Sequence, residues 1–296
     1  LGCPNDCVFC NQKSISGQKK NITKEDAKKI IDEFLEEIKD REGEKEIAFF
    51  GGSFTAIEES KQEELQKQER ERQAKIPKLT DEGKQNIKGI YKSETKRVFL
   101  TFDDGPSVNT ADVLDILKSN DIKATFFVLG TQVEKMPEMV KRAYQEGHYI
   151  ANHGYSHQYS QIYSSPETVL QEFNQCNSAV AKAIDVPEYN SHLFRFPGGS
   201  VGGKYANLKA EAVTLLEQNN IMHVDWNALT GDAEKSSPDE EYLMNNLQKT
   251  TQNKNSIVIL MHDAQAKRVT VEFLPKLIEF FQQQGYQFEN FYSIIK

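Results

Sequence analysis

Residues 95–296 are predicted to form an α/β fold, because short apolar segments alternate there with amphipathic segments of helical length. The apolar segments predict seven strands, over residues 98–102, 124–129, 149–152, 193–196, 222–226, 256–261 and a short one near 286–288. Helical periodicity predicts the connecting helices, over residues 110–119, 137–146, 166–184, 207–219, 240–251 and 269–284. The regular alternation indicates a parallel sheet, either open or closed into a barrel.

Two segments precede this domain and differ from it in composition. Residues 1–60 begin with a cysteine cluster and are predicted to be an incomplete α/β fragment. Residues 61–94 are rich in Lys, Glu, Gln and Arg, which predicts an exposed charged helix and a loose connector with few apolar residues to anchor a core. The isolated cysteine, Cys176, lies in an amphipathic segment, where a buried core thiol is expected.

The overall composition excludes several classes of protein. The chain has 296 residues and a formal net charge of −8, without a basic stripe, so nucleic acid is not an expected partner. The sequence has no run of about 18 apolar residues, so no membrane span is expected. No signal peptide is visible, but the chain begins at Leu1 rather than Met, which leaves its location open. The oligomeric state is also left open.

Two adjacent carboxylates, Asp103 and Asp104, follow the first predicted strand and precede Gly105-Pro106. One interpretation is a turn that caps the next helix. The other is functional: one carboxylate binds a metal and its neighbour acts as a base, because consecutive side chains at a strand end point in opposite directions.

Two histidines, His153 and His157, are four residues apart just after the third predicted strand. On a helical turn this spacing directs both imidazoles to the same side. Two histidines and one carboxylate form a common catalytic zinc set that leaves a position open for water. A pair of surface histidines is the alternative.

Arg195 ends the fourth predicted strand and is followed by Pro197-Gly198-Gly199. A guanidinium at this place can hold a carboxylate through two hydrogen bonds, although a surface salt bridge is an equal alternative. The glycines leave backbone N–H groups free to approach a substrate oxygen.

His262 follows the apolar strand 256–261, and Asp232 can orient its imidazole as a carboxylate–histidine pair. Trp226, the single tryptophan, ends the fifth predicted strand. Taken alone, each of these residues is as well explained by a structural role.

Five motifs together resemble the polysaccharide deacetylase family, carbohydrate esterase family 4, also called the NodB homology domain. They lie within residues 97–288 and read Thr101-Phe-Asp-Asp-Gly-Pro106, His153-Gly-Tyr-Ser-His157, Arg195-Phe-Pro-Gly-Gly199, Trp226 with Asp232, and Leu260-Met-His262. The resemblance implies a distorted seven-stranded (β/α) barrel, in which active sites assemble at the carboxyl ends of the strands.

The resemblance also implies a role for each motif residue. The ligands of a divalent metal, zinc or alternatively cobalt, would be Asp104, His153 and His157. Asp103 would be the base, held by Arg195, and Asp232 with His262 would be the acid pair. The backbone N–H of Gly198 would bind the oxyanion, and Trp226 with Leu260 would line the pocket for the acetyl methyl group.

The chain departs from the family pattern at three positions. Gly154 stands where Ser or Thr is usual, Gly198 stands where Tyr is usual, and Asp232 is followed by Ala233 instead of Trp. These departures affect the expected substrate range more than the expected reaction.

The implied activity is metal-dependent hydrolysis of acetyl groups from an N-acetylated polysaccharide, with release of acetate. Peptidoglycan N-acetylglucosamine and chitin-type oligomers are the expected substrates, and acetylxylan O-deacetylation is the alternative within the family. The family also implies a secreted or cell-envelope bacterial protein. A catalytically inactive carbohydrate-binding module is a further alternative, which the presence of both Asp103 and His262 argues against.

The N-terminal segment resembles a different family, the radical S-adenosylmethionine proteins. Cys3, Cys7 and Cys10 match its cluster motif, and 51–54 resembles its glycine motif. Three thiolates at this spacing can hold a [4Fe–4S] cluster. However, such a barrel needs about 200 residues, so we interpret residues 1–60 as a truncated fragment, joined by gene fusion or an assembly artefact, without a functional cluster.

Overall fold

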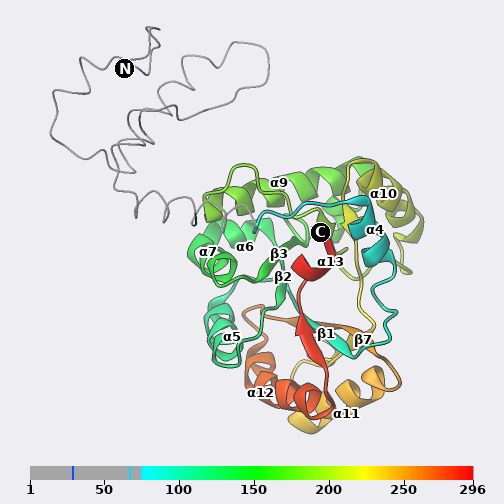
Figure 1. Ribbon diagram of the computed structural model, residues 1–296. Coiled ribbons are helices and arrows are strands. Elements are labelled where there is room, and N and C mark those ends of the chain that lie inside the picture. Colours follow the sequence, from blue (N-terminus) through cyan, green and yellow to red (C-terminus); the bar gives the residue numbers. More distant parts are fainter. Residues whose placement is uncertain (1–28, 30–66, 68–74, 296) are drawn as a thin grey trace, which may run out of the picture. The chain divides into compact units, whose positions relative to one another are not determined.

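The computed structural model describes residues 75–295, together with Lys29 and Lys67 (Figure 1). The predictions for residues 1–60, including Cys3, Cys7 and Cys10 as cluster ligands, lie outside these residues. One compact unit of the chain covers Ala74–Lys296. No helix of the described residues is long and apolar enough to cross a membrane.

The centre of the fold is a curled, wholly parallel sheet with the strand order β5-β4-β3-β2-β1-β7-β6, and β8 pairs separately with β1. The strands are β1 Arg97–Asp103, β2 Thr125–Val128, β3 Tyr149–Asn152, β4 Leu193–Phe194, β5 Met222–His223, β6 Ala228–Leu229, β7 Ser256–His262 and β8 Gln287–Glu289. The seven strands of this order form a half-barrel, which confirms the predicted seven-stranded (β/α) architecture.

One strand differs from its prediction. The segment 222–226 does not form one strand: β5 ends at His223, and the short strand β6 begins at Ala228. These two strands lie at opposite ends of the strand order, yet only residues 224–227 connect them. A connection of this length spans at most about 17 Å, so the sheet must curl until its two edges approach.

The six predicted helices are present within two residues of their expected ends, because strong local signals start several of them. Ser107 and Thr110 form a capping box at α5, Ser165 caps α9 ahead of a proline, and Asp239 caps α11. The helices are α4 Asp81–Lys88, α5 Val108–Ser119, α6 Gly130–Lys135, α7 Pro137–Gln145, α8 Tyr159–Ile162, α9 Pro166–Ile184, α10 Ala206–Gln218, α11 Glu240–Thr251, α12 Arg268–Gln283 and α13 Tyr292–Ile295.

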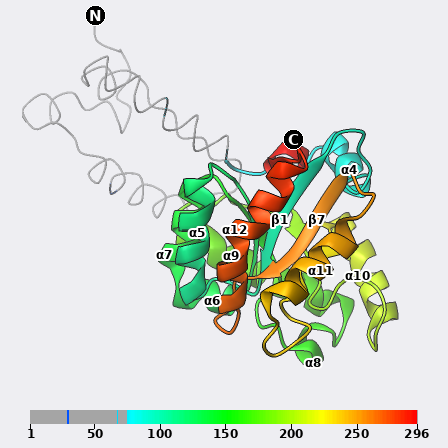
Figure 2. The ribbon, with the colours of Figure 1, turned by 90° about the horizontal axis from the view of Figure 1, so that it is seen from below.

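Strand β1 shows how the sheet positions the site. Its residues Val98, Leu100 and Phe102 belong to the large apolar cluster, together with residues of α5, α7, α9 and α12. These helices lie beside the sheet (Figure 2). The alternate residues face the inside of the curled sheet, where Phe99 joins a second apolar cluster. By the same alternation, Asp103 at the end of the strand faces inward, and its side chain is buried.

The expectation of a loose connector over residues 61–94 is wrong for its last part. Ile87 of α4 and Ile90 are buried in the inner apolar cluster, next to Ile294 and Ile295 of α13. A side chain on Gly83 would collide with the Ile295 carbonyl, which shows how closely α4 and α13 pack. The few apolar residues at the end of this segment are therefore sufficient to anchor it, because Ile87 on α4 and Ile90 just after it are both buried in the inner cluster. The predicted burial of Cys176 is confirmed.

Candidate metal centre and active site

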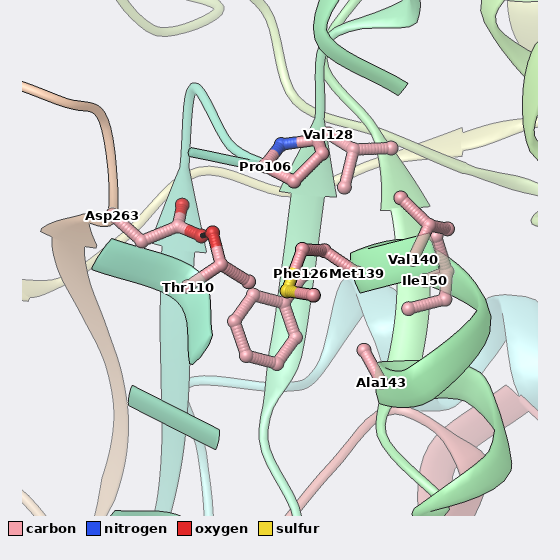
Figure 3. A pocket seen from close by; sticks show the side chains of 9 residues that line it. All are labelled: Pro106, Thr110, Phe126, Val128, Met139, Val140, Ala143, Ile150 and Asp263. Atoms are coloured by element: carbon pink, nitrogen blue, oxygen red, sulfur yellow. Dashed lines mark hydrogen bonds between the residues drawn. The ribbon is translucent and has the colours of Figure 1, made fainter. Parts of the chain in front are cut away.

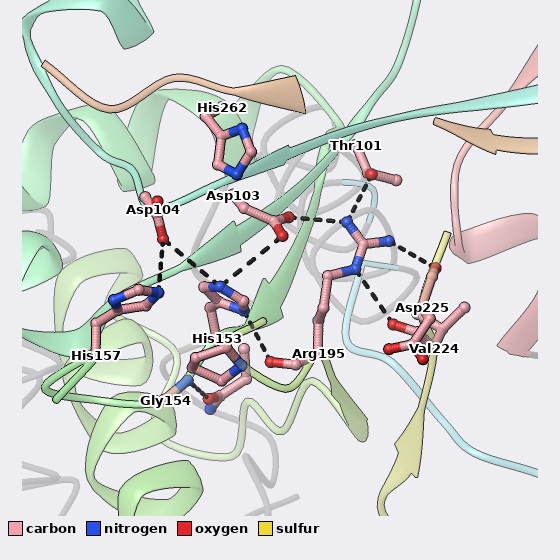
Figure 4. Close-up of polar contacts among 12 residues, drawn as sticks. Thr101, Asp103, Asp104, His153, Gly154, His157, Arg195, Val224, Asp225 and His262 are labelled. Atoms are coloured by element: carbon pink, nitrogen blue, oxygen red, sulfur yellow. Dashed lines mark hydrogen bonds and ion pairs between the residues drawn. The ribbon is translucent and has the colours of Figure 1, made fainter. Parts of the chain in front are cut away.

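The carboxyl ends of neighbouring parallel strands bring the predicted residues together (Figure 4). Asp103 ends β1, Asp104 follows it, and His262 ends the adjacent strand β7. On the other side, His153 follows β3 and Arg195 follows β4. This edge of a parallel βα sheet is where active sites form.

The proposed metal ligands converge on one point. The Asp104 Oδ1 atom lies 3.5 Å from His153 Nε2 and 3.4 Å from His157 Nε2. The three ligand atoms all lie within 4.8 Å of one another. Asp104 Oδ1 is buried and has no hydrogen-bond partner among the described residues. A buried carboxylate oxygen beside two imidazole nitrogens fits a divalent cation, which would satisfy it.

The surroundings of His153 prepare it as a neutral ligand. Its Nδ1 donates a hydrogen bond of 2.8 Å to the Arg195 carbonyl oxygen, which leaves the Nε2 lone pair directed at Asp104. Burial lowers the pKa of His153 to about 3, so the ring is uncharged at neutral pH.

The local backbone differs from two sequence-based expectations. His153 and His157 lie on a loop, not on a helical turn, and the loop turns through Gly154 at φ 89° and His157 at φ 59°. Asp104 has φ 72°, which breaks the strand alternation. As a result, Asp104 and Asp103 do not point in opposite directions: both carboxylates approach His153 Nε2, at 3.5 and 3.8 Å.

A buried glutamate that the sequence analysis did not single out holds this loop. Glu172 of α9 accepts hydrogen bonds from the backbone N–H groups of Tyr155 and Ser156, at 2.6 and 2.7 Å. Its second oxygen accepts from the Ser156 hydroxyl at 2.7 Å. Since these donors lie between the two histidines, Glu172 positions the loop that carries the candidate metal ligands. No local sequence signal marks it, because its partners lie on another element.

The guanidinium of Arg195 is fully buried and clamps Asp103. It donates to Asp103 Oδ1 at 2.8 Å and to the Thr101 hydroxyl at 2.7 Å. Its other nitrogens donate to the carbonyl oxygens of Val224 and Asp225, at 3.2 and 3.1 Å. This excludes the surface salt bridge as an explanation and fixes the orientation of the Asp103 carboxylate.

Asp103 keeps one oxygen free for chemistry. Burial raises the pKa of Asp103, and the positive charge of Arg195 opposes this shift. Oδ1 is bound by Arg195, whereas Oδ2 faces the metal ligands, 3.8 Å from His153 Nε2. A carboxylate with a raised pKa and a free oxygen has the properties of a general base.

Asp232 and His262 form the predicted pair. His262 Nδ1 lies 3.0 Å from Asp232 Oδ1, and its backbone N–H donates to Oδ2 at 2.8 Å. The Thr270 hydroxyl adds a hydrogen bond of 2.7 Å to Oδ2. Burial of His262 disfavours its charged form, but the hydrogen bond and charge of Asp232 outweigh burial and raise the pKa of His262 to about 9. The histidine is therefore protonated at neutral pH.

The glycine loop after β4 lies beside these groups. Gly198 and Gly199 have φ 73° and 81°, a conformation that other residues rarely adopt. A side chain on Gly199 would lie 3.3 Å from the ring of half-buried Trp226. Leu260, also half-buried, lies on β7 and pairs with Leu229 of β6. The structure thus places Trp226 beside the glycine loop and Leu260 beside β6.

A small cavity lies behind this edge and does not provide a substrate site (Figure 3). Its volume is about 10 Å³, and it is enclosed by apolar residues together with Thr110 and Asp263. Such a space is no larger than one water molecule needs. Thr110 donates to Asp263 Oδ2 at 2.5 Å, and burial raises the pKa of Asp263 to about 7.

The curled parallel sheet carries two histidines and two carboxylates close together at its carboxyl edge, an arrangement that is typical of metal-dependent hydrolases with an α/β fold. A family model described as "Polysaccharide deacetylase" matches residues 91–215. A relative named peptidoglycan-N-acetylglucosamine deacetylase, from Bacillus cereus, is 33% identical over 205 residues, covering 68% of this chain and 71% of the relative. The chain belongs to the polysaccharide deacetylase family, as its motifs predicted.

Two further comparisons agree with this assignment. A relative from Bacillus subtilis, named putative polysaccharide deacetylase YheN, is 36% identical over 198 residues, which are 65% of this chain and 66% of the relative. The solved structure of a Streptococcus mutans CE4 esterase matches with a TM-score of 0.64 and 30% identity, covering 70% of this chain and 90% of that chain. The chain thus spans about two thirds of the length of the Bacillus subtilis relative and 71% of the length of the Bacillus cereus relative.

Proposed function

We propose that this protein hydrolyses the acetamide of an N-acetylated polysaccharide and releases acetate. Peptidoglycan N-acetylglucosamine is the proposed substrate, with chitin-type oligomers next. The observation that carries this proposal is that two carboxylates with different surroundings approach His153 Nε2. Asp104, whose Oδ1 has no hydrogen-bond partner among the described residues, lies at 3.5 Å, and Asp103, which is hydrogen-bonded to Arg195, lies at 3.8 Å. One fits a metal ligand and the other a base. The name of the Bacillus cereus relative supports the choice of substrate.

The base half of the reaction belongs to Asp103. A zinc or cobalt ion held by Asp104, His153 and His157 would supply Lewis-acid polarisation of the acetamide carbonyl and of a water molecule. Asp103 Oδ2 accepts the proton of the attacking water, while Arg195 keeps the carboxylate oriented through Oδ1.

The acid half of the reaction belongs to His262. With a pKa raised to about 9, its imidazolium has a proton to donate to the departing amine, and Asp232 fixes the ring through Nδ1. The backbone N–H of Gly198 has no acceptor among the described residues, so it is free to donate to the carbonyl oxygen as charge develops there. Trp226 and Leu260 would enclose the acetyl methyl group.

Acetate release from N-acetylglucosamine oligomers, peptidoglycan and acetylxylan tests the proposal directly. We expect release from at least one N-acetylated glycan, loss of activity on chelation, and recovery with zinc or cobalt. Release from acetylxylan alone would identify an O-deacetylase. Binding of glycans without release from any of them would identify a binding module.

The variant His157→Ala tests the metal centre. It should lose bound metal and activity together, because it removes one of three protein ligands. The matched control is His192→Ala, which removes a histidine outside the triad whose ring contacts the Asn220 carbonyl. Full metal occupancy with an unchanged rate in His157→Ala would exclude His157 from the site.

A further inference from the structure

A tyrosine that no motif includes lies beside the candidate metal centre. Tyr159 begins α8, two residues after His157, and its ring centroid lies 5.5 Å from that of His157. Its ring also contacts that of Tyr163, at 5.6 Å. Tyr159 is 42% exposed and is one of only a few large, exposed, largely apolar side chains in residues 75–295. An exposed aromatic ring beside a candidate metal ligand is suited to contact whatever approaches the metal.

The hydroxyl of Tyr159 lies directly over the glycine loop. A Cβ atom built on Gly198 would lie 2.6 Å from this hydroxyl oxygen, closer than real Cβ contacts allow. The phenol therefore occupies the space that a side chain at Gly198 would take. Since the Gly198 N–H is the proposed oxyanion donor, the phenol lies against the residue that supplies that donor.

This hydroxyl differs from those of the neighbouring tyrosines. Tyr163 donates to the Pro197 carbonyl at 2.7 Å, and Tyr155 donates to Glu134 at 2.9 Å. In the part of the chain that the structure describes, the Tyr159 hydroxyl has no hydrogen-bond partner. An amphipathic ring with a spare donor and acceptor has the chemistry that recognises a sugar, which offers hydroxyl groups around an apolar ring face.

We propose that Tyr159 is a substrate-binding residue that determines affinity for the N-acetylhexosamine unit whose acetamide reaches the metal. Its ring packs against the sugar and its hydroxyl hydrogen-bonds to it, in the space left open by Gly198. This inference rests on the proposed deacetylase function. It concerns binding of the sugar, not the chemistry at the carbonyl.

Kinetics on two kinds of substrate test the role of Tyr159. On N-acetylglucosamine oligomers, Tyr159→Ala should raise KM about tenfold, and Tyr159→Phe about threefold, the effect of one lost hydrogen bond. The kcat values should change little, because the contact is made before and during the reaction alike. On 4-nitrophenyl acetate, which has no sugar, both variants should match the wild type. Metal content and Tm should be unchanged.

The matched control is Tyr155→Phe, which removes a hydroxyl four residues earlier that is bound to Glu134. It should leave KM for the oligomers unchanged. An unchanged KM in Tyr159→Ala, or equal losses on the oligomers and on 4-nitrophenyl acetate, would overturn the inference.

A double-mutant cycle with Gly198→Ala tests the contact itself. In the wild type this substitution must displace Tyr159, whereas in the Tyr159→Ala background it adds only backbone strain at φ 73°. The strain is common to both backgrounds, so the loss in kcat/KM on the oligomers should be several-fold larger when Tyr159 is present. Equal losses in both backgrounds would show that the two residues do not interact in the substrate complex.

Oligomer binding to the Asp103→Asn variant separates this inference from the proposed function. Tyr159→Ala should weaken the binding of N-acetylglucosamine oligomers to that variant by about tenfold, as one lost contact surface does. Weaker binding together with an inactive wild type would refute the deacetylase function and retain Tyr159 as a sugar contact. Unchanged binding beside an active wild type would refute only the role of Tyr159.

Discussion

Asp103 and Asp232 are two buried aspartates at the same edge of the sheet, each paired with a basic side chain, yet their surroundings differ. Asp232 uses both carboxylate oxygens: one faces the His262 ring, and the other accepts from the His262 N–H and from Thr270. Asp103 is bound by Arg195 through Oδ1 alone. Burial raises the pKa of Asp103, whereas the hydrogen bonds from His262 and Thr270 overcome burial and lower the pKa of Asp232.

This difference indicates which member of each pair moves a proton. Guanidinium groups do not act as proton donors in proteins, so in the pair with Arg195 the carboxylate of Asp103 is the candidate for proton transfer. In the other pair the pKa of the carboxylate is lowered and that of His262 is raised to about 9, so His262 is the member that can give up a proton. The same kind of ion pair therefore accounts for the proposed base in one place and the proposed acid in the other.

Glu172 extends the comparison to a third buried carboxylate. Its side chain accepts hydrogen bonds from the loop between the two candidate metal-ligand histidines, and both of its carboxylate oxygens act as acceptors. Like Asp232, it is a carboxylate that positions other groups. The number of donors on a buried carboxylate, more than its burial, separates the proposed base from the residues that hold others in place.

The largest expected effect is that of Asp103→Asn. It should lower kcat by about two to four orders of magnitude, the usual contribution of a general base. Bound metal should be retained, because Asp103 is not in the ligand triad. Metal analysis and acetate release measure the two properties separately. The control is Asp115→Asn, on the exposed surface of α5. Near-normal turnover in Asp103→Asn would make Asp103 a turn residue only.

Asp232→Asn should have a smaller effect and a different signature. The wild-type rate should fall as the pH rises through about 9, where His262 loses its proton. Without the Asp232 charge the pKa of His262 falls, so this limb of the pH profile should move to lower pH, with a loss of about tenfold to a hundredfold at pH 8. A profile that keeps its position would place the acid elsewhere.

Glu172→Gln should weaken metal binding by about tenfold, at the low end of the usual cost of altering a group that supports metal ligands. The amide cannot accept from all three donors as the carboxylate does. Competition with a chelator measures the affinity. Glu167→Gln, at an exposed position of the same helix, is the control and should bind metal normally. Equal affinities would show that the loop holds its shape without Glu172.

The smallest expected effect concerns stability. The pKa of His262 is about 9 in the folded protein and 6.5 in its ordinary state. Its contribution to stability is therefore complete below pH 6.5 and is lost as the pH rises through about 9. The Tm of the metal-free wild type should decrease over this pH range, by about 2–4 °C for each kcal/mol of unfolding free energy that is lost. His262→Gln should show a smaller decrease, and parallel curves would contradict the raised pKa.

Much of the fold was predictable because its signals are local. The helices begin at caps such as Ser165 with Pro166, and the strands are short apolar runs between them. The site residues were predictable as a set, since Asp103, Asp104 and His262 follow predicted strands whose carboxyl ends must meet in a parallel sheet. The conformation of the histidine loop was not, because spacing alone does not distinguish a helical turn from a loop.

The sequence by itself determined the elements, their order, and the chemistry available at one edge of the sheet. Only the tertiary structure decided which groups contact each other across large separations. Arg195 contacts Thr101 and Asp103 over more than ninety positions, and Tyr159 contacts the space above Gly198 from the short helix α8. Such contacts depend on how elements pack, which is a property of the whole core and leaves no mark in the neighbouring residues.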